Sequence, residues 1–449
     1  MPRAPLRTLI ALALPMVLAR ASQSVITFAD AIQVRHLGSR AIAAVSTGGL
    51  NVMGFVILPM GTVLIVQSFV SQLAGRRDTA SAARFAWYGL AIAAAAGVIA
   101  VALLPVIGAA LSLTGYSPGL RDEMTSYMDI RLLSVAAAVG IEALGNWYGG
   151  LGNTWMQMIA GGITMVSAVF FNWVLIDGHL GAPAMGVDGA ALASTIASWL
   201  GFAFILVAFL LRERTGPHGF SGKELRRVIR FGLPNGLNWF LEFAAFQVFV
   251  NVVMASLGDT TVAALNAVIA VNSVAFMPAF GLASAGAILA GQAIGRRATA
   301  DVWPQMKVTL ACTGVWMGAI GVLELAFPRD VLSLFADRDS QLVAIGAPML
   351  AISALWQVFD AVGITVSETL RAAGDTTWTA LVRLSLAWLV FAPSAYLVVR
   401  YTDGGAPGAM GCLVAYLALL ALALALRFRH GAWRSIELID HARPAPWQG

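Results

Sequence analysis

Twelve long apolar stretches follow one another along the sequence and limit the chain to one class of fold. A helix that crosses a membrane needs about 20 predominantly apolar residues, and each stretch reaches that length. Only 11% of the 449 residues are charged and 59% are hydrophobic, whereas soluble proteins carry about 25% charged residues. A water-soluble fold is therefore excluded, and we expect an all-α integral membrane protein with twelve transmembrane helices. The expected spans are 8–32, 46–72, 84–112, 127–148, 155–177, 184–211, 228–257, 262–290, 304–327, 342–369, 376–400 and 405–427.

Basic residues are distributed unevenly over the connections between these stretches. With the N-terminus in the cytoplasm, 19 of the 28 Lys and Arg residues fall on the cytoplasmic side, 7 on the outer side and 2 within spans. Because cytoplasmic loops carry an excess of Lys and Arg, we expect both termini to be cytoplasmic. The basic residues are scattered and form no continuous face, so nucleic acid is not an expected partner despite the net charge of +5.

Short motifs recur in the two halves of the chain at a nearly constant offset. QLAGRR at 72–77 returns as QAIGRR at 292–297, an offset of 220, and three further pairs match at offsets of 220 and 222. Leu14-Pro15 matches Leu233-Pro234 at 219. Such register indicates an internal repeat. Six spans in each repeat send both halves into the membrane in the same sense, as in transporters built from two bundles. We predict an N-terminal six-helix lobe over 1–212, a cytoplasmic linker over 213–227, a C-terminal six-helix lobe over 228–427 and a cytoplasmic tail over 428–449.

Residues typical of catalytic or metal sites are sparse. Cys312 and Cys412 both lie in apolar stretches without a CxxC partner, and the five His residues are dispersed. The sequence contains nothing like an HExxH, Walker or GxSxG motif. We therefore expect neither an enzyme nor a bound cofactor.

A carboxylate within the seventh span is the first candidate functional residue. A charge near the bilayer centre costs at least about 2.5 kcal/mol, so it needs a partner, a water-filled cavity or a proton. Glu242 follows Asn238 by four residues and Asn235 by seven, so the three share one helical face. Carboxylate and amide oxygens are ligands of small hard cations. The aromatic residues around Glu242 suit either packing or attraction of an organic cation.

Two further candidates lie in the tenth and first spans. Asp360 follows Trp356 by one turn. Asp30 belongs to a polar stripe at helical spacing that comprises Arg20, Gln23, Thr27, Asp30 and Gln33. Asp30 is close enough to the outer end of its span that snorkelling to the interface is an alternative. The sequence assigns no role to several other charged residues in or near spans, namely Arg20, Arg35, Asp129, Glu142 and Glu324.

Several of these segments resemble the multidrug and toxic compound extrusion (MATE) family. They are DAIQVRHLG at 30–38 with AIAAVS at 41–46, Gly232-Leu-Pro234 ahead of Glu242, GQAIG at 291–295, and Asp360 with LRAAGDT at 370–376. The resemblance covers the whole chain. The pairing of Glu242 with Asp360 is similar to the NorM-like bacterial branch.

The resemblance implies two pseudo-symmetric six-helix lobes that form a V-shaped central cleft, and antiport of organic cations against Na+ or H+. It makes Glu242 and Asp360, with Trp356, the cation and substrate site of the C-terminal lobe, to which helical spacing adds Asn235 and Asn238. In the N-terminal lobe it makes Asp30 the coupling carboxylate, Asn172 a liganding position and Ser194 a hydroxyl position, and the polar stripe of the first span adds Thr27. Glu242, Asp360 and Asp30 are possible Na+ ligands. Ala168 replaces an Asn that the family often carries, which weakens a complete Na+ site and leaves proton coupling through Asp30 open.

The same reading predicts the partners and the location. We expect small organic cations or drugs as substrates, membrane lipid as the surroundings, a monomer, and a multi-pass position in the plasma or inner membrane. Two alternatives remain. A flippase for lipid-linked precursors would need a cationic cavity, whereas only Arg20 and Arg383 are basic within the spans. A multi-pass membrane enzyme would need catalytic groups that the sequence lacks.

Overall fold

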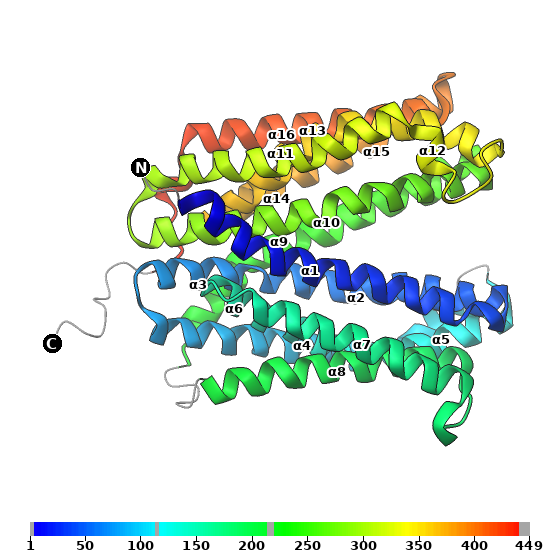
Figure 1. Ribbon diagram of the computed structural model, residues 1–449, viewed down its shortest axis with the longest axis horizontal. Helices are drawn as coiled ribbons and strands as arrows, with labels where there is room; N and C mark the ends of the chain where they lie inside the picture. Colours follow the sequence, from blue (N-terminus) through cyan, green and yellow to red (C-terminus); the bar gives the residue numbers. More distant parts are fainter. Residues whose placement is uncertain (1–3, 113–115, 213–219, 440–449) are drawn as a thin grey trace. The chain divides into compact units, whose positions relative to one another are not determined.

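The structure, a computed structural model, describes residues 4–112, 116–212 and 220–439, and the side chains at 4, 5, 21–25, 27–29, 31, 39 and 110 lie outside its description. Every regular element in these ranges is helical (Figure 1). The main helices are α1 (Ala4–Gln33), α2 (Ser39–Val63), α3 (Ile65–Gly75), α4 (Thr79–Ser112), α5 (Pro118–Leu132), α6 (Val135–Gly150), α7 (Trp155–Asp177), α8 (Gly186–Arg212), α9 (Gly222–Val248), α10 (Asp259–Gly295), α11 (Val302–Ala326), α12 (Pro328–Leu332), α13 (Gln341–Ala373), α14 (Thr376–Ser385), α15 (Ala392–Tyr401) and α16 (Gly405–His430).

Shorter helical turns connect or extend these helices. Two six-residue π-helices, η3 (Phe249–Met254) and η6 (Leu386–Phe391), continue α9 and join α14 to α15. The 3-10 turns are η1 (Arg35–Leu37), η2 (His179–Gly181), η4 (Ala255–Leu257), η5 (Thr299–Asp301) and η7 (Ala432–Ser435).

Ten helical segments within the described residues are long and apolar enough to cross a membrane. The remaining two expected spans correspond to α1 and to the α5–α6 pair. The fourth span was expected as one helix over 127–148, but its helix begins at Pro118 and breaks at Leu133 and Ser134. Ser134 Oγ donates to the Arg131 carbonyl at 2.6 Å at this break. The predicted all-α fold with about twelve spans is confirmed.

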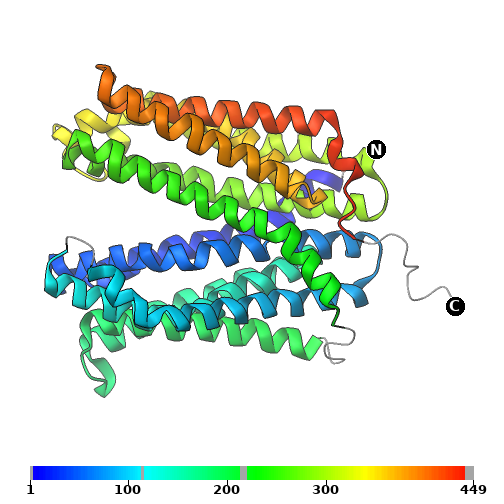
Figure 2. The ribbon, with the colours of Figure 1, turned by 180° about the vertical axis from the view of Figure 1, so that it is seen from behind.

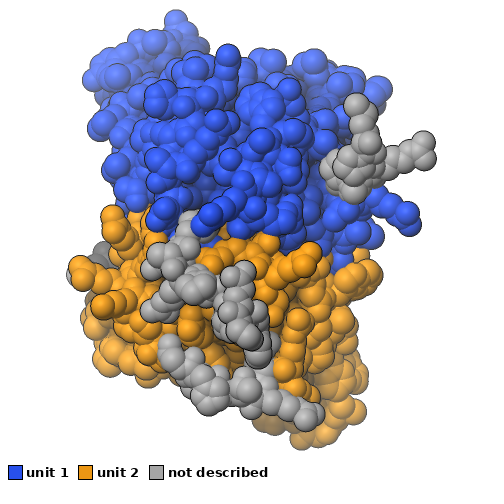
Figure 3. All heavy atoms as spheres, turned by 90° about the vertical axis from the view of Figure 1, so that its left-hand side faces the viewer, with its two compact units in different colours: residues 1–17, 237–449 blue, residues 18–236 orange. Residues whose placement is uncertain are grey.

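The chain divides into two compact units (Figure 3). One consists of residues 18–236, and the other of residues 1–17 and 237–449. In the first unit α7 packs along α8 and α4 along α6 (Figure 1). In the second, α13 packs against α10, α11 and α16, and α15 lies along α16 (Figure 2). The chain passes from one unit to the other after residues 17 and 236, whereas the predicted lobes are joined by the linker 213–227. The lobe boundaries stay a prediction.

The repeated motif closes equivalent helices in the two units. After α3, Arg77 has φ 61°, and after α10, Arg297 has φ 61°, which is the left-handed region that non-glycine residues rarely adopt. In each case the following residue donates its N–H to a carbonyl five positions back, from Asp78 to Leu73 at 3.0 Å and from Ala298 to Ala293 at 2.9 Å. Gly152 and Gly374, at φ 86° and 88°, form a second such pair of helix ends.

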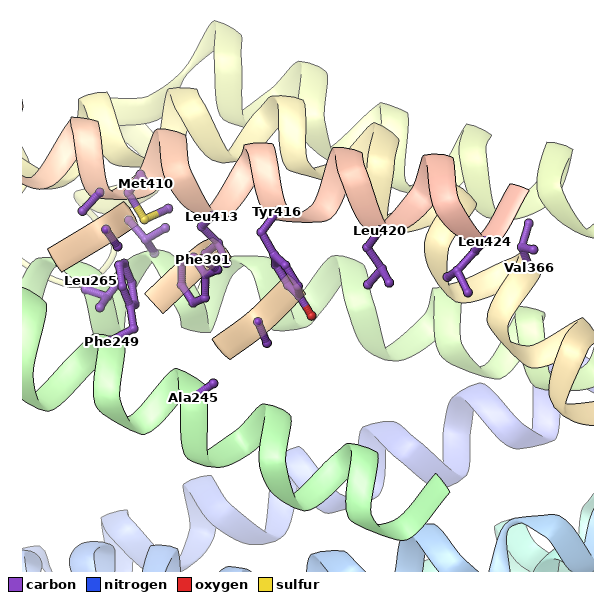
Figure 4. Close-up of a cluster of buried hydrophobic side chains, with 14 of the residues drawn as sticks. Ala245, Phe249, Leu265, Val366, Phe391, Met410, Leu413, Tyr416, Leu420 and Leu424 are labelled. Atoms are coloured by element: carbon purple, nitrogen blue, oxygen red, sulfur yellow. The ribbon is translucent and has the colours of Figure 1, made fainter. Parts of the chain in front are cut away.

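A large apolar cluster forms the interior of the second unit (Figure 4). Phe249, Phe391, Leu413 and Tyr416 belong to it, and each is at most 6% exposed. The Phe391 ring stacks on Tyr416 with 5.4 Å between centroids. This cluster fixes the position of the Tyr416 hydroxyl, which belongs to the site described below.

Glycines allow α9 to approach α2 closely within the first unit. A Cβ on Gly61 would lie 2.8 Å from the Gly236 Cα, and a Cβ on Gly236 would meet the Leu58 carbonyl and the Thr62 hydroxyl. A side chain at these positions would therefore force the two helices apart. This contact decides where Asn235, the neighbour of Gly236, makes its hydrogen bond.

Candidate ion and substrate sites

Asp30 in α1 is held by two side chains from α7 and α8. Asn172 Nδ2 donates to Asp30 Oδ1 at 2.5 Å, and Ser194 Oγ donates to Asp30 Oδ2 at 3.4 Å. Asn172 is fully buried and Ser194 is 5% exposed. Three of the four residues expected in the N-terminal lobe site therefore lie together within residues 18–236. The side chain of the fourth, Thr27, lies outside the described residues.

This cluster has an unused oxygen. Asn172 Oδ1 is buried and has no hydrogen-bond partner among the described residues. Ala168, one turn before Asn172, is buried and supplies no ligand atom. Arg131 and Tyr127 in α5 lie close enough to Asp30 to interact with its charge. The site thus offers carboxylate, amide and hydroxyl oxygens, the ligands of hard cations.

Glu242 in α9 is bound by an arginine and a tyrosine of the second unit. Arg383 Nη1 donates to its two carboxylate oxygens at 2.9 and 3.2 Å. The Tyr416 hydroxyl donates to Oε1 at 3.0 Å. The Glu242 and Arg383 side chains are 34% and 18% exposed, so the pair is only partly enclosed. Arg383 Nη2 also donates to Ser367 Oγ at 3.4 Å.

Asp360 in α13 belongs to the same charged group. Trp356 hydrogen-bonds to it, and both Arg383 and Glu242 lie within range of its charge. Asp360 and Trp356 are half-buried. Two carboxylates and one guanidinium group leave this cluster with one excess negative charge when all are ionised. Glu242, Asp360, Arg383, Trp356 and Tyr416 are called the Glu242 cluster below.

Of the two asparagines expected beside Glu242, one is held elsewhere. Asn235 donates from Nδ2 to the Gly61 carbonyl of α2 at 2.6 Å, because Gly61 and Gly236 bring α2 and α9 into close contact. The structure therefore does not place Asn235 in the Glu242 cluster. Asn238 Oδ1 is buried without a hydrogen-bond partner among the described residues. Asn238 thus keeps an oxygen available one turn from Glu242.

The arginine partners were missing from the sequence interpretation. Arg20 donates to Glu142 Oε1 at 2.7 Å, and Asn146 Nδ2 donates to the same oxygen at 3.0 Å. The two arginines within spans, Arg20 and Arg383, each therefore bind a carboxylate of their own unit. A signal was present: an arginine in a span needs a counter-charge, and intramembrane carboxylates are few. The local sequence pattern did not indicate which carboxylate each arginine would bind, or that the Tyr416 hydroxyl would donate to Glu242.

No group of three or more His, Cys, Asp or Glu side chains capable of holding a metal occurs among the residues whose placement is described. A cation held in either cluster would therefore take amide, hydroxyl or water oxygens as well. The carboxylates predicted as Na+ ligands, Asp30 in one unit and Glu242 with Asp360 in the other, have such groups beside them. Their role as ion ligands stays a prediction.

Helical bundles with carboxylates and arginines inside the spans are typical of multi-pass integral membrane transporters, and comparisons with known proteins show the class and the family. The MatE family model matches residues 15–174 and 237–397. The protein named "Probable multidrug resistance protein NorM" from Pseudomonas putida is 27% identical over 453 residues, covering 98% of this chain and 97% of that protein.

Solved structures share the fold. A MOP superfamily transporter from Pyrococcus furiosus has a TM-score of 0.87 at 22% identity, covering 96% of this chain and 97% of that one. An outward-facing multidrug resistance MATE family transporter has a TM-score of 0.86 at 22% identity with the same coverage. The chain belongs to the MATE family of multidrug transporters and is NorM-like. Members of this family are transporters and not enzymes, which confirms the expectation that the chain transports small molecules.

Proposed function

We propose that this transporter exports amphipathic organic cations in exchange for Na+ or H+. The observation that carries the proposal is that two carboxylates, Glu242 and Asp360, share a single arginine, Arg383, within membrane spans. When all three are ionised, one negative charge is in excess. A carboxylate kept in this environment attracts a cation, and the attraction is strong where water is scarce. Trp239 stacks edge-on to Phe280 at 5.7 Å between centroids, so aromatic faces for an organic cation lie on α9 and α10 of the same unit.

Asp30 and its neighbours are the proposed site of the coupling ion. The Asp30 carboxylate and the unpartnered Asn172 Oδ1 supply oxygens for Na+, and the carboxylate alone supplies a place for a proton. Na+ and H+ are both candidates for the coupling ion. H+ is kept because Ala168 stands where a side-chain ligand for Na+ could otherwise lie. In this mechanism, ion entry from outside neutralises a carboxylate and lowers the affinity for the organic cation. Exchange then requires that ion and substrate prefer different conformations.

The flippase alternative loses support from the two pairings. A cationic cavity for a pyrophosphate headgroup would need positive charge in excess, whereas Arg20 and Arg383 are each bound by a carboxylate. The remaining features of the proposal rest on the sequence analysis. We propose a monomer in the plasma or inner membrane, surrounded by lipid and with both termini in the cytoplasm. We propose no bound cofactor and no nucleic-acid partner.

Transport into proteoliposomes tests the function. The full chain is reconstituted into liposomes, ethidium is supplied as the transported probe, and a Na+ gradient or a pH gradient is imposed across the membrane. We expect wild type to move ethidium with one of the gradients, and Asp30→Asn and Asp360→Asn to lose most of this movement. Asp330→Asn is the matched control, because Asp330 is exposed and its salt bridge is to the exposed Arg338. Ethidium movement that responds to neither gradient, or that is unchanged in both site variants, would refute the proposal.

A further inference from the structure

Glu324 in α11 is a carboxyl group that the proposed function does not use. Its side chain is fully buried, and its nearest partners are neutral. Gln357 Nε2 lies 3.0 and 3.2 Å from its two oxygens. Ser353 also hydrogen-bonds to it. Both partners are on α13 and are at most 1% exposed.

Close helix packing explains why these groups meet. Gly321 precedes Glu324 by one turn, and a Cβ there would lie 3.1 Å from the Ala354 carbonyl and 3.4 Å from the Gln357 Cβ. The glycine therefore allows α11 to approach α13, which brings Glu324 against Gln357. This contact leaves no open space beside Gly321 on the α13 side.

The hydrogen-bond donors in this cluster are already in use. Gln357 Nε2 donates to Asn272 Oδ1 at 2.7 Å as well as to Glu324. Asn272 Nδ2 donates to the Val268 carbonyl at 2.8 Å and to Ser353 Oγ at 3.2 Å. Ser353 Oγ lies 2.7 Å from the Leu350 carbonyl, to which it donates. An ionised Glu324 would thus rely on shared donors from neutral groups.

One acceptor in the cluster lacks a donor. Gln357 Oε1 is buried without a hydrogen-bond partner among the described residues. It belongs to the amide whose nitrogen contacts Glu324. A proton on the Glu324 carboxyl group would add the donor that this group of side chains lacks, since a protonated carboxyl has one O–H and an ionised one has none.

Among the described residues of α10, α12, α13 and η5, which pack against α11, no positive charge pairs with Glu324. On α13, Asp360 interacts with Trp356 and Arg383, and Glu368 binds Arg371. The other charged groups on α11 and on the elements packed against it are exposed: Asp259, Asp301, Lys307, Arg329 and Asp330. A buried charge without a partner costs several kcal/mol, whereas a neutral acid avoids that cost.

We propose that Glu324 is a proton-binding site. Its side chain is a neutral carboxylic acid that is hydrogen-bonded to Gln357 and Ser353. Release of the proton requires water to reach Glu324, so proton occupancy is tied to the packing of α11 against α13. The site is separate from the Asp30 and Glu242 clusters. Its existence does not depend on export of organic cations, and it is tested without measuring transport.

Infrared spectroscopy of the purified full-length protein in lipid tests the proposal. A protonated carboxyl group gives a C=O stretching band distinct from that of a carboxylate. We expect wild type to show such a band and Glu324→Gln to lose it, while Asp30→Asn and Asp360→Asn retain it. Gln357→Met should shift the band, because it removes the amide that contacts the acid. It also serves as the test if Glu324→Gln does not fold.

Thermal unfolding supplies a matched comparison. Glu324→Gln replaces one neutral group with another of the same shape, so its Tm should change little. Glu142→Gln removes the carboxylate that Arg20 binds and should lower the Tm clearly. A band that persists in Glu324→Gln, no shift in Gln357→Met, or equal losses of Tm in Glu324→Gln and Glu142→Gln would overturn the proposal. Loss of one bound Na+ per chain in Glu324→Gln without loss of the band would overturn it as well.

Discussion

Arg383 donates from a single nitrogen to both carboxylate oxygens of Glu242, at 2.9 and 3.2 Å. The two residues are 141 positions apart and come from α14 and α9. Their contact changes how the site works: Glu242 alone is not a free anion, and the excess charge of the cluster depends on Asp360. An organic cation bound here would meet a neutralised pair and one further carboxylate.

Removal of the Glu242 charge should therefore destabilise the protein as well as impair transport. Glu242→Gln removes the carboxylate to which Arg383 donates, and breaking a fully buried pair costs about 3 to 5 kcal/mol. Because this pair is partly exposed, we expect about 2 kcal/mol, measured by denaturant unfolding in micelles. The double variant Glu242→Gln/Arg383→Gln should recover part of the loss. A double variant less stable than the single one would contradict the pairing.

Tyr416→Phe isolates the third member of this contact. The variant keeps the ring that stacks on Phe391 and removes only the hydroxyl donor to Glu242. A hydrogen bond to a charged group contributes about 1.5 to 3 kcal/mol, so we expect a loss of about 1.5 kcal/mol in the same unfolding experiment. Tyr396→Phe is the control, since Tyr396 is 47% exposed and should change stability by less than about 0.5 kcal/mol. Equal effects of the two variants would argue against the Tyr416 contact.

The two partners of Asp30 should differ in their effect on the coupling ion. Asn172 lies 2.5 Å from Asp30 and Ser194 lies 3.4 Å away. We expect Asn172→Ala to weaken the apparent affinity for the driving ion by about tenfold or more, and Ser194→Ala to weaken it less. Initial transport rates at graded Na+ concentration or pH measure both values. A larger effect of Ser194→Ala would show that the amide is not the main partner.

Glycine contacts between α2 and α9 give a prediction about packing. Gly236→Ala places a methyl group against the Leu58 carbonyl and the Thr62 hydroxyl, and overpacking costs about 1 to 3 kcal/mol. Gly318→Ala, in α11 with nothing within 4 Å of its Cβ position, should instead stabilise by about 0.5 to 1 kcal/mol. Paired unfolding curves of the two variants check the opposite signs. A neutral Gly236→Ala would contradict the close approach of these helices.

The sequence predicted the helices well because hydrophobic length is a local property. Each apolar stretch became one helix or a helix with one break, and the repeated motif at 72–77 and 292–297 closed equivalent helices with the same backbone geometry. The helical face of Asn235, Asn238 and Glu242 also followed from spacing alone. In contrast, the break at Leu133 and Ser134 has no glycine or proline beside it to signal it.

Pairing between distant helices could not be predicted in this way. Spacing puts Asn235 and Glu242 on one face, but the glycines of α2 and α9 direct Asn235 to Gly61. Arg383 and Tyr416 reach Glu242 only because α14 and α16 pack in the same unit. Only the family resemblance predicted that Asp30, Asn172 and Ser194 share a site. Their separations of 142 and 22 residues in the sequence do not indicate contact.

The left-handed residues that close α3 and α10 have a consequence for engineering. Arg77 and Arg297 adopt a conformation that costs a side-chain-bearing residue about 1 to 2 kcal/mol. Glycine at either position would relax the backbone and would also delete one of the cations from which the orientation in the bilayer is predicted. At both bends, the lower backbone strain that glycine would allow and the positive charge that arginine supplies compete for a single position. A variant with glycine at both would relieve the strain and lose two of the charges on which the predicted orientation rests.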